Sequence, residues 1–182
     1  PETKELLKRM APVALGSGAA QINLVIDVML ASLLAAGSIS WLYYADRVYE
    51  LPLAVIGIAL GTALLPLQSK QIRLGDHDAA RATLNRALEA ASLLVLPATA
   101  ALIVLAEPII DALFRRGAFA AGDVAATAGA LIAYTVGLPA YVAVKILTPN
   151  FYARGDTRAP VKIAIFAVIF NTACGASLMG FV

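Results

Sequence analysis

The sequence predicts an all-α integral membrane protein, and two observations support this fold class. Of the 182 residues, 60% are hydrophobic and 14% are charged, and the mean hydropathy is +0.81. Soluble domains are closer to half apolar and a quarter charged. The apolar residues are also gathered into runs long enough for a helix to cross the hydrocarbon core of a bilayer. We predict five transmembrane helices, at residues 6–34, 39–69, 90–114, 124–149 and 161–182, with a short cytoplasmic amphipathic helix at 79–89.

The composition also argues against several classes of function. A net charge of +2 without clustered basic stripes gives no support for nucleic-acid binding. The single cysteine and the single histidine, Cys174 and His77, are far apart and have no second ligand at metal-binding spacing. No nucleophile–base set or phosphate-cradling glycine loop is present. We therefore expect no enzyme, no cofactor and no metal.

The first predicted span, 6–34, follows a basic segment and carries polar residues inside it. Asn23 and Asp27 are four residues apart, so they share one face of a helix. That face could make hydrogen bonds to a neighbouring helix, or it could form the wall of a polar cavity. Both interpretations remain open from the residues alone.

The second span, 39–69, follows a short connector and carries three charged residues near its start. Glu50 is three residues from Arg47 and four from Asp46, so its carboxylate can reach either side chain. A charge near the centre of a bilayer costs about 2.5–3.5 kcal/mol on insertion scales, and such residues usually face a protein interior or a water-filled cavity. This argument predicts a polar site inside a helical bundle.

The neighbouring aromatic residues allow a second interpretation of that cluster. Trp41, Tyr43 and Tyr44 are typical of a membrane-interface belt. Counting back ~20 residues from Lys70 puts the edge of the hydrocarbon near Glu50. On that count the charges lie at the headgroup level, where they cost little. Physical chemistry alone does not choose between the buried and the interfacial position.

The remaining segments follow from polarity and turn residues. A turn at 75–78 precedes a helix at 79–89 that we expect to lie on the membrane surface before the third span, 90–114. In the fourth span, 124–149, the single Lys145 is predicted to reach toward the headgroups. The fifth span is 161–182. Because the chain starts at Pro1 and stops inside an apolar run, we expect it to be part of a longer protein.

Lysine and arginine are concentrated on one predicted side of the membrane. That side holds the N-terminal segment and the connectors around 70–86 and 154–162, whereas the opposite loops hold only Arg115 and Arg116. Cytoplasmic loops carry an excess of basic residues. The basic loops are therefore predicted to be cytoplasmic, and the Asp46–Glu50 cluster to lie in the outer half of the membrane.

Four stretches together resemble the MurJ/MviN family of lipid II flippases. They are LYYADRVYELP at 42–52, GIALGTALLP at 57–66, LFRRGAF at 113–119 and FYARGDTRAP at 151–160. The resemblance covers essentially the whole chain. It implies a MOP-superfamily fold of two helical lobes around a central cavity, of which this chain would form the first part of the C-terminal lobe.

The resemblance also implies a function. The family moves an undecaprenyl-diphosphate-linked peptidoglycan precursor across the bacterial inner (plasma) membrane by alternating access, in a multi-pass protein whose N-terminal lobe belongs to the same chain. Its Asp-Arg pair matches Asp46 and Arg47, and the arginine is expected to receive the diphosphate. The predicted substrate-binding residues are Arg47, Asp46, Glu50 and Asn23. The alternatives are another MOP-type exporter, a polysaccharide flippase, or a non-transporting membrane scaffold for cell-wall synthesis.

Overall fold

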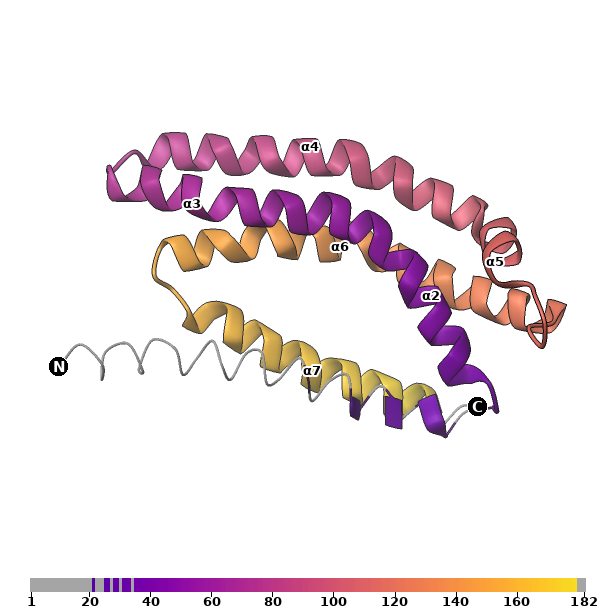
Figure 1. Ribbon diagram of the computed structural model, residues 1–182. Coiled ribbons are helices and arrows are strands. Elements are labelled where there is room, and N and C mark those ends of the chain that lie inside the picture. Colours follow the sequence, from indigo (N-terminus) through magenta and orange to yellow (C-terminus); the bar gives the residue numbers. More distant parts are fainter. Residues whose placement is uncertain (1–20, 22–24, 27, 30, 34, 180–182) are drawn as a thin grey trace. The chain divides into compact units, whose positions relative to one another are not determined.

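The computed structural model describes residues 21, 25–26, 28–29, 31–33 and 35–179, and every regular element among them is a helix (Figure 1). The chain divides into two compact units. One comprises Gly37–Arg154, and the other combines Pro1–Ala36 with Gly155–Val182. Most of the predicted first span, 6–34, lies outside the described residues. Asn23 and Asp27 are both outside them.

The predicted second span is one rod built from three helical segments. These are α2 (Ser38–Pro52), the π-helix η1 (Leu53–Ile58) and α3 (Ala59–Arg73). The π-helix begins directly after Pro52, which has no backbone N–H and clashes with the preceding turn of an α-helix. The wider π-turn accommodates that proline, and Figure 1 shows the rod bending where α2 meets α3.

The start of α2 requires a glycine. Gly37 precedes the helix with φ 104°, a left-handed conformation that residues with a Cβ rarely adopt. A Cβ at this position would also lie 2.9 Å from Cζ2 of the Trp41 ring. The ring therefore packs directly over the glycine and closes the first turn of the helix.

The predicted surface helix at 79–89 is not a separate element. It forms the first part of α4 (His77–Val104), which continues without a break through residues 89 and 90. The Asp76 side chain caps this helix by accepting the N–H of Ala79 at 2.9 Å. The apolar side chains that suggested a membrane surface instead pack within the protein, since Ala80 is fully buried and Leu84 contacts the core. The prediction of a distinct surface helix is therefore wrong.

The predicted third span also ends differently. α4 stops at Val104, and after Leu105 a short helix, α5 (Ala106–Phe114), takes a new direction (Figure 1). Pro108 explains the break, because its missing N–H cannot continue the hydrogen-bond ladder to Val104. Four helical segments among the described residues are long and apolar enough to cross a membrane: Ser38–Arg73, His77–Val104, Ala121–Ala153 and Arg158–Gly175.

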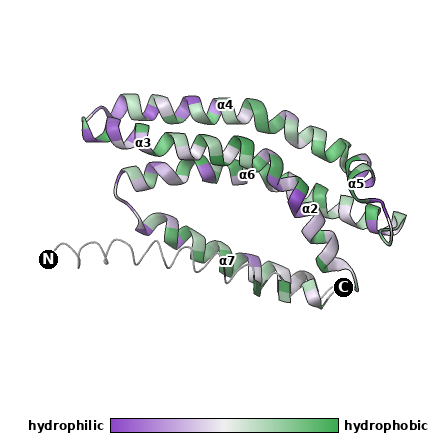
Figure 2. Ribbon diagram, in the orientation of Figure 1, coloured by the Kyte–Doolittle hydropathy of each residue, from purple (hydrophilic) through white to green (hydrophobic). Residues whose placement is uncertain are grey.

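The central helix of the larger unit is α6 (Ala121–Ala153), which contacts each of the other helices in that unit. Its side chains at 131, 138 and 146 are completely buried, and they form the middle of two apolar clusters. Hydrophilic residues gather at the turn between α3 and α4, whereas the helix bodies are largely apolar (Figure 2). This pattern matches a bundle that faces lipid along its length.

The α2–η1–α3 rod and α6 run side by side in the same direction. Contacts between them recur at a nearly constant separation of 82 to 85 residues. They join Trp41 to Asp123, Tyr49 to Tyr134, Gly57 to Val142 and Gly61 to Lys145. A Cβ at Gly61 would lie 2.7 Å from the carbonyl oxygen of Lys145, so only glycine allows the two backbones to come this close.

The smaller unit contributes α7 (Arg158–Met179). The carboxylate of Asp156 accepts the N–H groups of Arg158 and Ala159 at 3.0 and 3.1 Å, which satisfies donors at the start of this helix. Apolar side chains such as Ile163, Phe166 and Phe170 are exposed on it. An exposed apolar surface of this kind is expected of a helix that meets lipid or another helical element.

Candidate functional site

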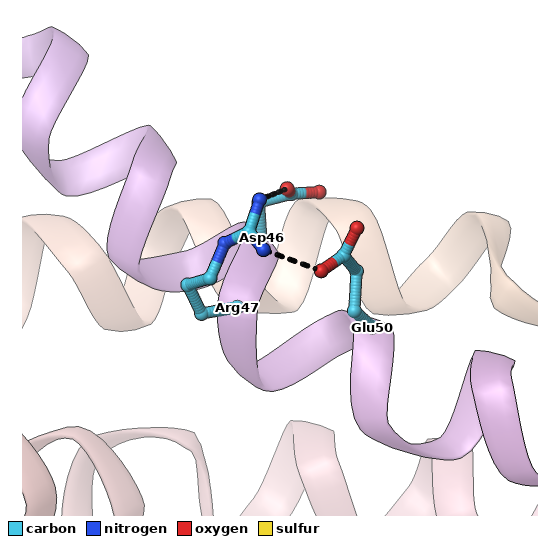
Figure 3. A network of polar contacts seen from close by, with 3 residues as sticks. All are labelled: Asp46, Arg47 and Glu50. Carbon is cyan, nitrogen blue, oxygen red and sulfur yellow. Dashed lines mark hydrogen bonds and ion pairs between the residues drawn. The ribbon is translucent and has the colours of Figure 1, made fainter.

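The three predicted charged residues on α2 do form one cluster (Figure 3). Arg47 donates from Nη1 to Oε2 of Glu50 at 2.9 Å, and its Nη2 lies 3.4 Å from Oδ2 of Asp46. The guanidinium carbon is also 5.0 Å from the centre of the Tyr43 ring. Two carboxylates and one aromatic face therefore hold a single cation.

Exposure shows how strongly these groups are held. The side chains of Arg47, Asp46 and Glu50 are 50%, 42% and 48% exposed. An ion pair this open contributes about 1 kcal/mol or less to stability, because solvent screens it. The cluster is therefore not a buried core network of this chain, and its carboxylates can release the guanidinium at little cost.

Two of the aromatic residues beside this cluster make contacts within the protein. The indole N–H of Trp41 donates to Oδ1 of Asp123 at 2.8 Å, and Oδ2 of the same carboxylate accepts the N–H of Ala120 at 2.8 Å. Tyr44 packs against Phe114 and Phe119, with ring centres 4.7 and 5.5 Å apart. Trp41 and Tyr44 thus tie the start of α2 to α5 and α6, and the position of these residues at a membrane interface stays a prediction.

A second cation lies further along the same pair of helices. Lys145, on α6, is half-buried, and its Nζ is 5.1 Å from the centre of the Tyr141 ring. Tyr141 is one turn nearer the start of α6, so the lysine side chain turns back along the span. The prediction that Lys145 reaches toward the headgroups stays a prediction, because the contact with Tyr141 does not place the ammonium relative to a membrane.

Tyr134 and Tyr141 on α6 lie near this region, and sequence reasoning did not single them out. Tyr49 packs on Tyr134 with ring centres 5.8 Å apart, and it lies within electrostatic range of both Asp46 and Tyr141. A sequence signal for part of this surface exists. Residues 134, 141 and 145 follow the spacing that places side chains on one face of a helix.

This arrangement can bind an anion. Arginine presents five N–H donors in a planar fork, and the two carboxylate contacts leave some of them available. The fork suits phosphate oxygens, which accept charge-assisted hydrogen bonds. The fold and this site together define a multi-pass helical membrane protein with a half-exposed cationic group suited to an anionic ligand.

Comparison with known proteins specifies the family. The family profile described as "Lipid II flippase MurJ" matches residues 1–182. The chain therefore belongs to the MurJ family. This match confirms the resemblance noted from the four sequence stretches.

Individual relatives agree with this assignment. The chain is 44% identical over 179 residues to a probable lipid II flippase MurJ of Rickettsia prowazekii, covering 98% of this chain and 35% of the relative. It is 41% identical over 169 residues to the lipid II flippase MurJ of Burkholderia cenocepacia, covering 93% and 33%. The chain thus spans about a third of the length of the curated relatives it matches.

A solved structure shares the fold. A protein described as lipid II flippase MurJ in an inward closed conformation matches with a TM-score of 0.80 and 32% sequence identity. The match covers 94% of this chain and 36% of that one. The helical arrangement is therefore that of a MurJ segment.

Proposed function

We propose that this chain forms part of a flippase that moves an undecaprenyl-diphosphate-linked peptidoglycan precursor across the bacterial inner membrane. Arg47 receives the diphosphate, and Asp46 and Glu50 hold the arginine when no substrate is bound. The observation that carries this proposal is a half-exposed guanidinium on a candidate membrane span, in contact with two solvent-accessible carboxylates. Relatives at 38–44% identity are named as lipid II flippases or probable ones.

The physical reason lies in the cost of moving a charged headgroup. A diphosphate-linked sugar cannot enter hydrocarbon without losing its hydration, so a carrier must replace water with fixed donors. A guanidinium does this with paired hydrogen bonds, and partial exclusion of water strengthens the attraction. Because the carboxylate contacts are weak, substrate can displace them, and they can re-form after release.

Alternating access requires a place where helices can change direction. The π-helix η1 begins three residues after Glu50, so the bend in the rod is adjacent to the cation. π-turns frequently occur at functional sites. We propose Pro52 as one pliant point, with Pro97 and Pro139 on α4 and α6 as others and Pro12 outside the described residues.

The remaining parts of the proposal concern the rest of the transporter and rest on membership of the family. We propose that an N-terminal lobe of the same protein completes the cavity, that the basic connectors face the cytoplasm, and that Asn23 contributes to the cavity wall. A fifth transmembrane helix at 6–34 belongs to this arrangement. The length of the relatives, about three times that of this chain, supports the larger assembly.

The test uses a chimera in which this chain replaces the matching segment of the Burkholderia cenocepacia relative. We expect Arg47→Ala to slow lipid II translocation in proteoliposomes by about tenfold or more, since it removes a charge-assisted contact. Arg86→Ala is the matched control, because Arg86 is an exposed helical arginine away from the site. It should leave translocation unchanged.

The same chimera distinguishes the alternative functions. A membrane scaffold for cell-wall synthesis would tolerate Arg47→Ala and would instead depend on the surface at 70–89. Unchanged translocation in Arg47→Ala, with protein levels equal to those of the parent chimera, would remove Arg47 from the proposed site. Transport of other lipid-linked polysaccharides in preference to lipid II would favour a different exporter.

A further inference from the structure

Lys145 is a cation whose position the proposed function does not yet explain. In the sequence it is the only charged residue between Asp123 and Arg154. It is half-buried on α6, and its ammonium lies over the Tyr141 ring rather than toward the nearer end of the helix. Helical side chains lean toward the start of their helix, which brings the ammonium over Tyr141, but the ring carries no charge to balance it.

No carboxylate balances this charge in the described part of the chain. The ion pairs found there join Arg47 to Asp46 and Glu50, and Arg115 to Asp111. A cation–π contact with Tyr141 is the interaction of the Lys145 ammonium that the structure records. A partly desolvated cation without a counter-charge is costly, and an arriving anion would recover that cost.

The backbone of Lys145 is held firmly in place. Its carbonyl oxygen packs against Gly61, where a Cβ would approach to 2.7 Å, and its own Cβ would lie 3.7 Å from a Cβ on Gly57. Both glycines belong to the rod that carries Arg47. The two cations are therefore presented by one packed pair of helices, and each has a fixed height along it.

Those heights differ by much of the membrane thickness. Tyr134 lies beside Tyr49, which is two residues beyond Arg47, and Lys145 follows Tyr134 by eleven residues. At 1.5 Å per residue, this corresponds to about 16 Å along α6. The hydrocarbon core is about 30 Å thick, so the two cations belong to different halves of the span.

We propose that Lys145, with Tyr141, forms a second subsite for the diphosphate of the polyprenyl-linked substrate, nearer the α3–α4 turn than Arg47. This inference rests on the proposed flippase function and deepens it. The diphosphate first meets Lys145 and later Arg47. The packed rings of Tyr134 and Tyr49 lie at a level between the two subsites along this pair of helices.

An ordinary anionic phospholipid has the same phosphate chemistry, so the test must separate the two sources. The chimera described above is placed in nanodiscs of phosphatidylcholine, whose headgroup does not react with amine reagents, with three additions tested in parallel. These are undecaprenyl diphosphate, uncharged undecaprenol and phosphatidylglycerol. The rate at which an amine-reactive reagent modifies each lysine is then followed by mass spectrometry of the peptides.

We expect undecaprenyl diphosphate to slow modification of Lys145 by about tenfold, as occupancy at ten times the dissociation constant would. Lys70 and Lys162 are exposed internal controls, and their rates should not change. Undecaprenol and phosphatidylglycerol should leave Lys145 as reactive as in their absence. The variant Lys145→Arg should bind the probe as the parent does, whereas Lys145→Gln should weaken binding.

Three results would overturn the subsite. They are equal protection by phosphatidylglycerol, no protection by the diphosphate lipid, and a Lys145 that the reagent never reaches. Failure of the proposed function is a separate result. If the parent chimera translocates lipid II and Lys145 stays unprotected, the subsite fails alone. If Lys145 is protected and Arg47→Ala translocates normally, the assignment of Arg47 fails alone.

Discussion

Arg47 and Lys145 are both cations on candidate membrane spans, but they differ in exposure and in the groups they contact. Arg47 is half exposed and contacts two carboxylates, at 2.9 and 3.4 Å. Lys145 is half-buried and, among the described residues, forms no ion pair. An anion at Arg47 must compete with those acids, whereas an anion at Lys145 meets an uncompensated charge.

The contacts that join the helices also differ between the two cations. Near Arg47 the helices are joined by side chains, through the Trp41–Asp123 hydrogen bond and the rings of Tyr44, Phe114 and Phe119. Near Lys145 they are joined by direct backbone packing at Gly61. Side-chain contacts can exchange partners, but two backbones in contact can only separate. The difference indicates that this helix pair has a rearranging end near Arg47 and a fixed end near Lys145.

The largest effect is expected at the fixed end. Gly61→Leu places atoms where a Cβ alone would be 2.7 Å from the Lys145 carbonyl, so the helices must separate. Overpacking of this kind costs about 1–3 kcal/mol or more, and we expect a clear fall in the thermal unfolding midpoint of the purified chimera. Gly129→Ala is the control, because no atom lies within 4 Å of a Cβ there. Equal midpoints for the two variants would contradict the close packing.

An intermediate effect is expected at the rearranging end. Trp41→Phe keeps an aromatic ring over Gly37 but removes the N–H that Asp123 accepts. The midpoint should fall by less than in Gly61→Leu, because only one contact is lost. Tyr43→Phe serves as the control, since Tyr43 is exposed. In a double-mutant cycle with Asp123→Asn, additive losses would show that Trp41 and Asp123 are not coupled.

The smallest effect on stability is expected in the charged cluster itself. Glu50→Gln removes the 2.9 Å ion pair, and an exposed pair of this kind is worth about 0.5 kcal/mol. The variant leaves Arg47 with one competing carboxylate fewer. Undecaprenyl diphosphate should therefore bind more tightly, by about threefold. Fluorescence titration in nanodiscs measures this change, with Glu89→Gln as an exposed control. Weaker binding would show that Glu50 positions the arginine rather than competing for it.

Several features could be predicted because their causes are local. The turn before α4 follows from Gly75 and Asp76, and the proximity of Glu50 to Arg47 follows from helical spacing. The break at Leu105 could have been anticipated from Pro108. The contact of Lys145 with Tyr141 is also local, since Tyr141 is four residues earlier on the same helix.

Other features depend on neighbours far along the chain. The face of α4 at Ala80 and Leu84 suggested a membrane surface because an apolar stripe looks the same whether it meets lipid or protein. The interfacial interpretation of Trp41 rested on residue type alone, which does not reveal that its N–H finds an acceptor 82 residues away. Periodicity reports that a face is apolar but not which surface covers it.

The sequence by itself determined the class of protein, the approximate positions of its long apolar helices and the charges placed within one turn of each other. These depend on composition and on helix geometry, which act over a few residues. Only the tertiary structure decided that the rod carrying Arg47 lies against α6 in one register, from Trp41 at Asp123 to Gly61 at Lys145. That register depends on close packing between segments more than eighty residues apart, and no local preference specifies it.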